Sequence, residues 1–261
     1  MQQRHLDRLA YFGEEVATSQ AFYLPYVRSF VGSLESLNII EIGCGEGGNL
    51  LPFFHAGARV TGVDLSEKKI ALAKRYFRLN KAQGVFLTDD FLNCPLDCGG
   101  FDVVICHDVI EHISPSKKLP FIQRLGALLK ERSGVAFIGF PAWQMPFGGH
   151  QQMCGHPIIS HLPWIHLLPK QVYRGLLSLA GEREGTIREL LEIKESGVSV
   201  ESFLRLCEES KLEILDSRLW FINPHYQVKF GLVPIELCSF VSGMPYVRNF
   251  LSTSCFFVLT N

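Results

Sequence analysis

The sequence predicts an α/β fold built on a doubly wound, mostly parallel sheet of seven strands. Short apolar segments alternate with helical patterns between residues 37 and 140, which is typical of a parallel sheet with helices on both faces. Residues 141–198 interrupt this alternation after the fifth strand and are too long for a simple connection, so we expect an insertion there. Residues 253–260 are rich in β-branched and aromatic side chains and predict a reversed last strand beside a strand at residues 212–221.

The expected elements follow one another in a regular order. Residues 14–33 carry apolar side chains at helical spacing, so residues 1–36 are expected to form an N-terminal helical segment. Strands are expected at residues 37–43, 59–63, 85–88, 101–106 and 135–140. Helices are expected at residues 49–56, after the capping residue Ser66, around residues 119–129 and at residues 200–207. We expect no helix between the last two strands, and residues 1–261 are expected to form a single domain.

Composition limits the surroundings and partners of the protein. A formal net charge of −1 does not favour nucleic acid as a ligand. No apolar run reaches the ~18 residues of a membrane-spanning helix, and residues 1–5 lead into a charged stretch without the apolar core of an export signal. The eight cysteines form no C-x-x-C pair, which is typical of reduced thiols. We therefore expect a cytoplasmic protein without a membrane span, as a monomer or a homodimer.

A glycine-rich turn follows the first expected strand. Gly43, Gly45 and Gly48 fit the pattern G-x-G-x-x-G, in which glycines allow positive φ and close approach of the backbone to a ligand. Asp64 ends the second expected strand, where a carboxylate accepts hydrogen bonds from ribose hydroxyls. NAD and S-adenosylmethionine both carry such a ribose, so these residues leave both cofactors open. In a third interpretation the glycines only form a tight turn and Asp64 caps a helix.

The wider series of motifs resembles that of the class I S-adenosylmethionine-dependent methyltransferases. The resemblance rests on residues 41–47 (EIGCGEG), 60–66 (VTGVDLS), 89–91 (DDF) and 101–112 (FDVVICHDVIEH), which occur in the family's order and spacing. It implies a Rossmann-like methyltransferase fold and S-adenosylmethionine as the cofactor. The acidic side chains of Glu41 and Glu46 beside the turn would also repel a pyrophosphate, which argues against NAD.

The resemblance further implies a role for each matching residue at the cofactor. The backbone of Gly43, Cys44 and Gly45 would pass close to the methionine part of the cofactor. Glu41 would support the turn, His107 would lie along the methionine, and Asp64 would bind the ribose hydroxyls. The residues expected around the adenine are Leu65, Phe91, and Asp90 or Asp89 as the acceptor for the adenine amine.

Two carboxylates and an imidazole follow the fourth expected strand. Asp108, Glu111 and His112 share one face of a helical turn, and three such groups can bind a divalent metal. The pattern resembles the E-x-x-E-H motif of the ubiquinone-pathway O-methyltransferases and of the small-RNA 3′-terminal 2′-O-methyltransferases, with Asp108 in place of the first glutamate. We favour a loop ordered by Glu111 and His112 without a metal. Asp108 and His112 are also candidate catalytic residues, with His112 as a base.

The 141–198 insertion is the candidate cover of the acceptor site, or an interface between subunits. It begins at the carboxyl edge of the sheet, where ligands bind in such folds. Trp143, Met145 and Trp164 suit an apolar or aromatic small molecule. The glycine pair before His150 is a candidate hinge, and His150 is the candidate catalytic base.

The predicted function is methyl transfer from S-adenosylmethionine to a small-molecule acceptor. Oxygen is the expected acceptor atom, because an alcohol or phenol needs a base and this sequence supplies histidines and carboxylates near the cofactor motifs. Three alternatives remain open. They are a metal-assisted RNA 2′-O-methyltransferase, a non-catalytic module that binds S-adenosylmethionine, and an NAD-linked oxidoreductase.

Overall fold

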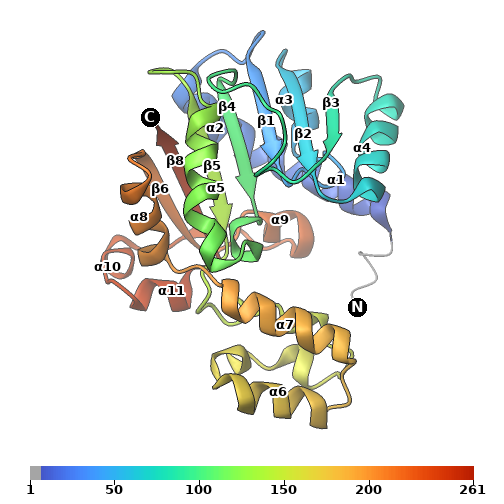
Figure 1. The fold of residues 1–261 in the computed structure, drawn as a ribbon, viewed down its shortest axis with the longest axis vertical. Coiled ribbons are helices and arrows are strands. Elements are labelled where there is room, and N and C mark those ends of the chain that lie inside the picture. The colour runs from blue at the N-terminus through green and yellow to red at the C-terminus, as the bar shows by residue number, and fades with distance from the viewer. Residues whose placement is uncertain (1–6) are drawn as a thin grey trace.

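An eight-stranded sheet forms the centre of the computed structural model, which describes residues 7–261 (Figure 1). The strand order is β3-β2-β1-β4-β5-β8-β6-β7. Strands β1 to β5 pair in parallel, and β8 pairs antiparallel with both β5 and β6. The strands are β1 (Asn38–Ile42), β2 (Arg59–Asp64), β3 (Val85–Thr88), β4 (Val103–His107), β5 (Val135–Phe140), β6 (Glu213–Ile222), β7 (Ile235–Glu236) and β8 (Ser254–Thr260).

Helices cover both faces of this sheet, as the apolar strands predicted. One face packs against α1 (Arg8–Thr18), α2 (Leu24–Val31), α3 (Leu50–His55) and α4 (Glu67–Leu79), and a π-helical segment, Ser19–Tyr23, joins the first two. The other face packs against α5 (Pro115–Leu128) and α8 (Val200–Glu209). Neighbouring strand residues point to opposite cores, so Ile39 and Ile40 are both fully buried on different sides.

The 141–198 insertion forms a small unit of its own at the carboxyl edge of the parallel strands (Figure 1). It contains three short 3₁₀ turns, then α6 (Lys170–Leu179) and α7 (Glu184–Ser196). Tyr173 and Leu177 of α6 pack against Ile187 and Leu190 of α7 in a separate hydrophobic cluster. The Ser196 hydroxyl donates a hydrogen bond to the backbone oxygen of Glu111 at 2.6 Å. The insertion is therefore anchored to the turn that follows β4.

The structure corrects two expectations about the chain's last third. The sheet has eight strands rather than seven, because the two-residue strand β7 pairs with β6 at the edge. Three short helices lie between β6 and β8, where none was expected: α9 (His225–Phe230), α10 (Ser239–Ser242) and α11 (Val247–Leu251). Each has six residues or fewer, which is too short for a helical period to show. The expected reversal of the last strand is confirmed.

Other expectations concern the N-terminus, the membrane and the thiols. Residues 1–6, which include the stretch interpreted as lacking an export signal, lie outside the described residues. Within residues 7–261, no helix has both the length and the apolar composition to cross a membrane. All eight cysteines are free thiols.

Candidate functional site

Backbone hydrogen bonds fix the glycine turn to the end of β2. The amides of Gly43 and Cys44 both donate to the Val63 oxygen, at 2.8 and 3.1 Å. The Gly45 amide donates to one carboxylate oxygen of Asp64 at 3.0 Å, and the Ser66 amide donates to the other at 2.8 Å. Asp64 therefore joins the turn to the start of α4, where the predicted cap Ser66 accepts from the Lys69 amide.

Glycine is required in the turn for two reasons. Gly43 and Gly45 have φ angles of +73° and +52°, which side chains of L-residues rarely adopt. A Cβ atom on Gly43 would also lie 2.3 Å from the Cγ2 atom of Val109 in the loop after β4. The turn therefore packs directly on the loop that carries the candidate catalytic residues.

Glu41 is buried beneath this turn, with a side-chain exposure of about 1%. Its Oε1 atom accepts a hydrogen bond from the Asn49 amide at 2.7 Å, whereas Oε2 has no hydrogen-bond partner among residues 7–261. Burial raises the pKa of Glu41 to about 8, and the charge of Asp64 adds to this increase. The ionised carboxylate therefore needs a cation that these residues do not supply.

The expected adenine-binding residues lie in different surroundings at the ends of β2 and β3. Leu65 is 75% exposed beside Asp64. Asp90 is occupied locally, because its carboxylate oxygens accept from the Leu92 amide and the Asn93 side chain. Phe91 is buried in the core instead, where its ring packs edge-on against Phe121. Asp89 donates its backbone amide to the Asp64 oxygen at 3.2 Å and so ties β3 to β2.

His107 and Asp108 lie side by side at the end of β4. The His107 Nδ1 atom lies 3.3 Å from the Asp108 Oδ2 atom, and its ring stacks on Tyr23 with centroids 4.7 Å apart. Asp108 has a left-handed φ of +54°. Partial desolvation would raise the pKa of Asp108, whose side chain is 58% exposed, but the attraction of His107, followed by that of His225 and His150, lowers it. Asp108 is thus held as an anion among several imidazoles.

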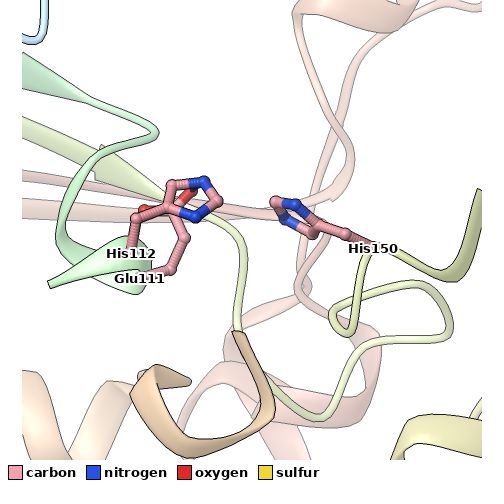
Figure 2. Close-up of side chains that lie close together, drawn as sticks. All are labelled: Glu111, His112 and His150. Carbon is pink, nitrogen blue, oxygen red and sulfur yellow. Dashed lines mark ion pairs between the residues drawn. The ribbon is translucent and has the colours of Figure 1, made fainter. Parts of the chain in front are cut away.

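Glu111, His112 and His150 come together from two different loops (Figure 2). Each offers one potential metal-ligand atom, and these atoms lie within 4.8 Å of one another. The rings of His112 and His150 have centroids 5.1 Å apart at 72°, and the His112 Nε2 atom is 4.0 Å from a Glu111 oxygen. The expected metal set of Asp108, Glu111 and His112 is thus replaced by one in which His150 takes the place of Asp108.

The electrostatics of this cluster favour neutral groups. Glu111 is buried, and neither of its carboxylate oxygens accepts a hydrogen bond within the described part of the chain. Burial and the charge of Asp108 raise the pKa of Glu111. Burial, followed by the charge of His112, lowers the pKa of His150 to about 4. The cluster therefore holds an unpaired carboxyl group and two unprotonated imidazoles.

Comparisons with known proteins agree with this geometry. The profile of a family described as a methyltransferase domain matches residues 39–132, the part that carries the turn, Asp64 and the loop after β4. This match confirms the predicted resemblance to the class I S-adenosylmethionine-dependent methyltransferases. The match ends before His150, so the 141–198 insertion lies outside the matched region.

Individual relatives share about 30% sequence identity with this chain over less than half of its length. A magnesium-protoporphyrin O-methyltransferase of Synechocystis is 33% identical over 109 residues, which cover 41% of this chain and 46% of the relative. A ubiquinone biosynthesis O-methyltransferase of Bordetella avium is 28% identical over 120 residues, covering 44% and 47%. The crystal structure of the Synechocystis enzyme with bound SAH has a TM-score of 0.57 at 17% identity and covers 94% of this chain and 82% of that one, which supports the fold. The chain spans about half the length of these sequence relatives.

The residues around the turn fit S-adenosylmethionine, the cofactor that the resemblance implies. Its methionine end carries an ammonium group and its sulfur is a cation, whereas it has no phosphate. The unpartnered Oε2 atom of Glu41 and the buried carboxyl group of Glu46 suit positive charge and would oppose a pyrophosphate. Each carboxylate oxygen of Asp64 accepts one backbone amide and retains a lone pair for a ribose hydroxyl.

Sequence reasoning missed the contributions of α1 and α9 to the site. Tyr226 of α9 lies near Asp108, whose charge adds to burial in raising the pKa of the phenol. The Thr18 hydroxyl of α1 hydrogen-bonds the His225 Nδ1 atom at 2.9 Å. Burial and the charges of Glu41 and Glu46 raise the pKa of Glu15 of α1. The charge of Glu15, together with burial and the charge of Asp108, raises the pKa of the Tyr11 phenol on the same helix. None of these residues belongs to a local motif, so no pattern in the sequence indicated them.

Proposed function

We propose that the protein transfers the methyl group of S-adenosylmethionine to an oxygen atom of a small, apolar or aromatic acceptor. The observation that carries this proposal is the convergence of His112 and His150 beside Asp108 at the carboxyl edge of the sheet. The sequence relatives named as O-methyltransferases support oxygen as the acceptor atom. Exposed apolar side chains of the insertion, Ile158, Leu162 and Trp164, support an apolar acceptor.

In this proposal, one set of residues binds the cofactor and another set acts on the acceptor. Glu41 and the Gly43–Gly45 backbone hold the methionine part, and Asp64 holds the ribose. The cofactor supplies a methyl carbon that is already activated by its bond to a cationic sulfur. The protein must then align the acceptor oxygen, exclude water and remove a proton.

His150 is the proposed base in this mechanism. Its imidazole is unprotonated, so a nitrogen lone pair is available for the proton of an acceptor hydroxyl. Asp108 attracts positive charge on His150 and stabilises the imidazolium that forms. The insertion brings His150 to the loop after β4 and is proposed to act as the cover that shields the acceptor site.

The test uses His150→Ala with His161→Ala as a matched control, because His161 is an exposed histidine of the same insertion. In a methyl-transfer assay over a panel of phenols and hydroxy acids, His150→Ala should lower kcat by about 10²- to 10⁴-fold. Affinity for S-adenosylhomocysteine should stay unchanged in both variants. Wild-type activity in His150→Ala would contradict the base assignment. A wild-type protein that binds NAD but not S-adenosylhomocysteine would contradict the whole proposal.

A metal-assisted mechanism is the second candidate, and one specific observation favours it. The two unpartnered oxygens of Glu111 face the imidazoles of His112 and His150, which is a donor set suited to a divalent transition metal. A bound metal would lower the pKa of an acceptor hydroxyl in place of a base. Chelation with EDTA followed by added metal separates the two mechanisms. The base mechanism requires full activity after chelation, whereas the metal mechanism requires loss, restoration by metal, and an equal loss in Glu111→Gln.

Two further proposals concern the protein as a whole. We propose a cytoplasmic location, which the eight free cysteines support. A monomer or a homodimer remains the proposed state. RNA as the acceptor is less well supported than a small molecule, because the formal net charge is −1.

A further inference from the structure

Helix α1 lies directly on the glycine turn. A Cβ atom on Gly48 would be 2.5 Å from the Cβ atom of Glu15 and 2.6 Å from its Oε2 atom. The Phe12 ring of the same helix packs against Tyr76 of α4 with centroids 4.9 Å apart. The Phe12 contact therefore helps to hold α1, and with it Glu15, against the turn.

The carboxyl groups of Glu15, Glu41 and Glu46 lie near this contact, and the cations around them do not balance three negative charges. Glu41 and Glu46 are each about 1% exposed. Arg8 lies 3.1 Å from Glu46. The Tyr11 hydroxyl hydrogen-bonds the Glu15 carboxylate, and the charge of Lys69 acts on it, but neither Glu15 nor Glu41 forms an ion pair within residues 7–261. The Oε2 atoms of Glu15 and Glu41 are buried without hydrogen-bond partners in the same part of the chain. Buried anions of this kind are stable only with a cation or a proton.

The position of the cluster relates it to one end of the cofactor. Asp64, the proposed ribose ligand, lies on the β2 side of the turn. Tyr11 lies one helical turn before Glu15, and the pKa of its phenol is raised first by Glu15 and also by Asp108. Glu15 therefore lies against the turn and near Glu41, beside the Gly43–Gly45 backbone that is proposed to hold the methionine part.

We propose that Glu15 is a binding residue for the methionine end of the cofactor. With Glu41 it accepts hydrogen bonds from the ammonium group, which has three donors and prefers carboxylate oxygens. This inference rests on the proposed function. It adds that cofactor binding fixes α1 over the turn and, through the bond between Thr18 and His225, orders α9 beside Asp108.

The variant Glu15→Gln tests this assignment, with Glu209→Gln as the matched control. Glu209 is an exposed glutamate on α8, so the control makes the same charge change away from the turn. The probes are S-adenosylhomocysteine, which carries the amino-acid end, and methylthioadenosine, which lacks it. Calorimetry should show that Glu15→Gln lowers the affinity for S-adenosylhomocysteine by about 10- to 100-fold. Methylthioadenosine should bind as to wild type, and the control should bind both probes normally.

Other outcomes are decisive. Normal binding of S-adenosylhomocysteine by Glu15→Gln, or an equal loss for both probes, would overturn the role of Glu15. Wild-type protein that binds neither probe would instead overturn the proposed function. Hydrogen exchange of the wild-type protein gives a second measurement that needs no variant. S-adenosylhomocysteine should slow exchange in α1 and methylthioadenosine should not, and equal protection by both probes would contradict the inference.

Discussion

In the absence of ligand, the Glu41→Gln variant should become more stable than the wild-type protein as the pH rises. Burial raises the pKa of Glu41 from its ordinary value of 4.5 to about 8 in the folded chain. Between these values the folded protein holds a proton that the unfolded chain has released, so stability falls with increasing pH. Each pH unit in this window removes about 1.4 kcal/mol. The ionising carboxyl group therefore costs up to about 5 kcal/mol by about pH 8.5.

Glutamine suits this comparison because it keeps the shape of the side chain and its oxygen can still accept from Asn49. Urea unfolding of both proteins at about pH 5 and about pH 8.5 measures the effect, since other titrating groups contribute to both proteins and largely cancel. The two proteins should be similarly stable at the lower pH, and the variant should be more stable at the higher pH. A difference in stability that does not change with pH would refute the buried titration of Glu41.

Two further predictions concern the turn itself. Asp64→Ala should weaken the binding of S-adenosylhomocysteine by about 1–3 kcal/mol, because hydrogen bonds to the ribose are lost. An unchanged affinity, measured by calorimetry, would exclude the ribose-binding role of Asp64. Gly43→Ala should lower the thermal midpoint more than Gly32→Ala does. Both positions have positive φ, but only an added Cβ at Gly43 meets Val109, while Gly32 has open space within 4 Å in the described residues. Equal effects would show that backbone strain, and not the contact with Val109, requires glycine at residue 43.

The cofactor half of the molecule was predictable because its information is local in the sequence. An apolar strand, a glycine turn and a terminal carboxylate are contiguous patterns, and each reflects a local physical requirement. Asp64 illustrates this well. The sequence placed it at the end of a strand, and the structure adds that it holds the turn by accepting the Gly45 amide. The predicted contact of Phe91 with the adenine stays a prediction, and the structure adds that its ring packs against Phe121.

The candidate acceptor site could not be predicted in the same way, because it depends on contacts between segments that are distant in the chain. Nothing near His150 in the sequence indicates that its ring would lie 5.1 Å from that of His112. That contact depends on how the insertion folds back, including the hydrogen bond from Ser196 to Glu111. Helix α9 was missed for a related reason, since its six residues carry too little periodicity to predict a helix.

The two halves of the site therefore have different origins in the fold. Apart from the proposed contribution of Glu15, the donor half comes from one continuous region, residues 39–132, which matches a methyltransferase domain. The candidate acceptor half comes from segments after β4, β5 and β6, whose carboxyl ends meet at one edge because these strands run in the same direction. The insertion and α9 can change sequence without disturbing the turn or Asp64, since neither contributes to the hydrogen bonds that hold them. Acceptor specificity should accordingly follow the insertion and α9, while the binding of S-adenosylmethionine follows the turn, Asp64 and the carboxylates around it.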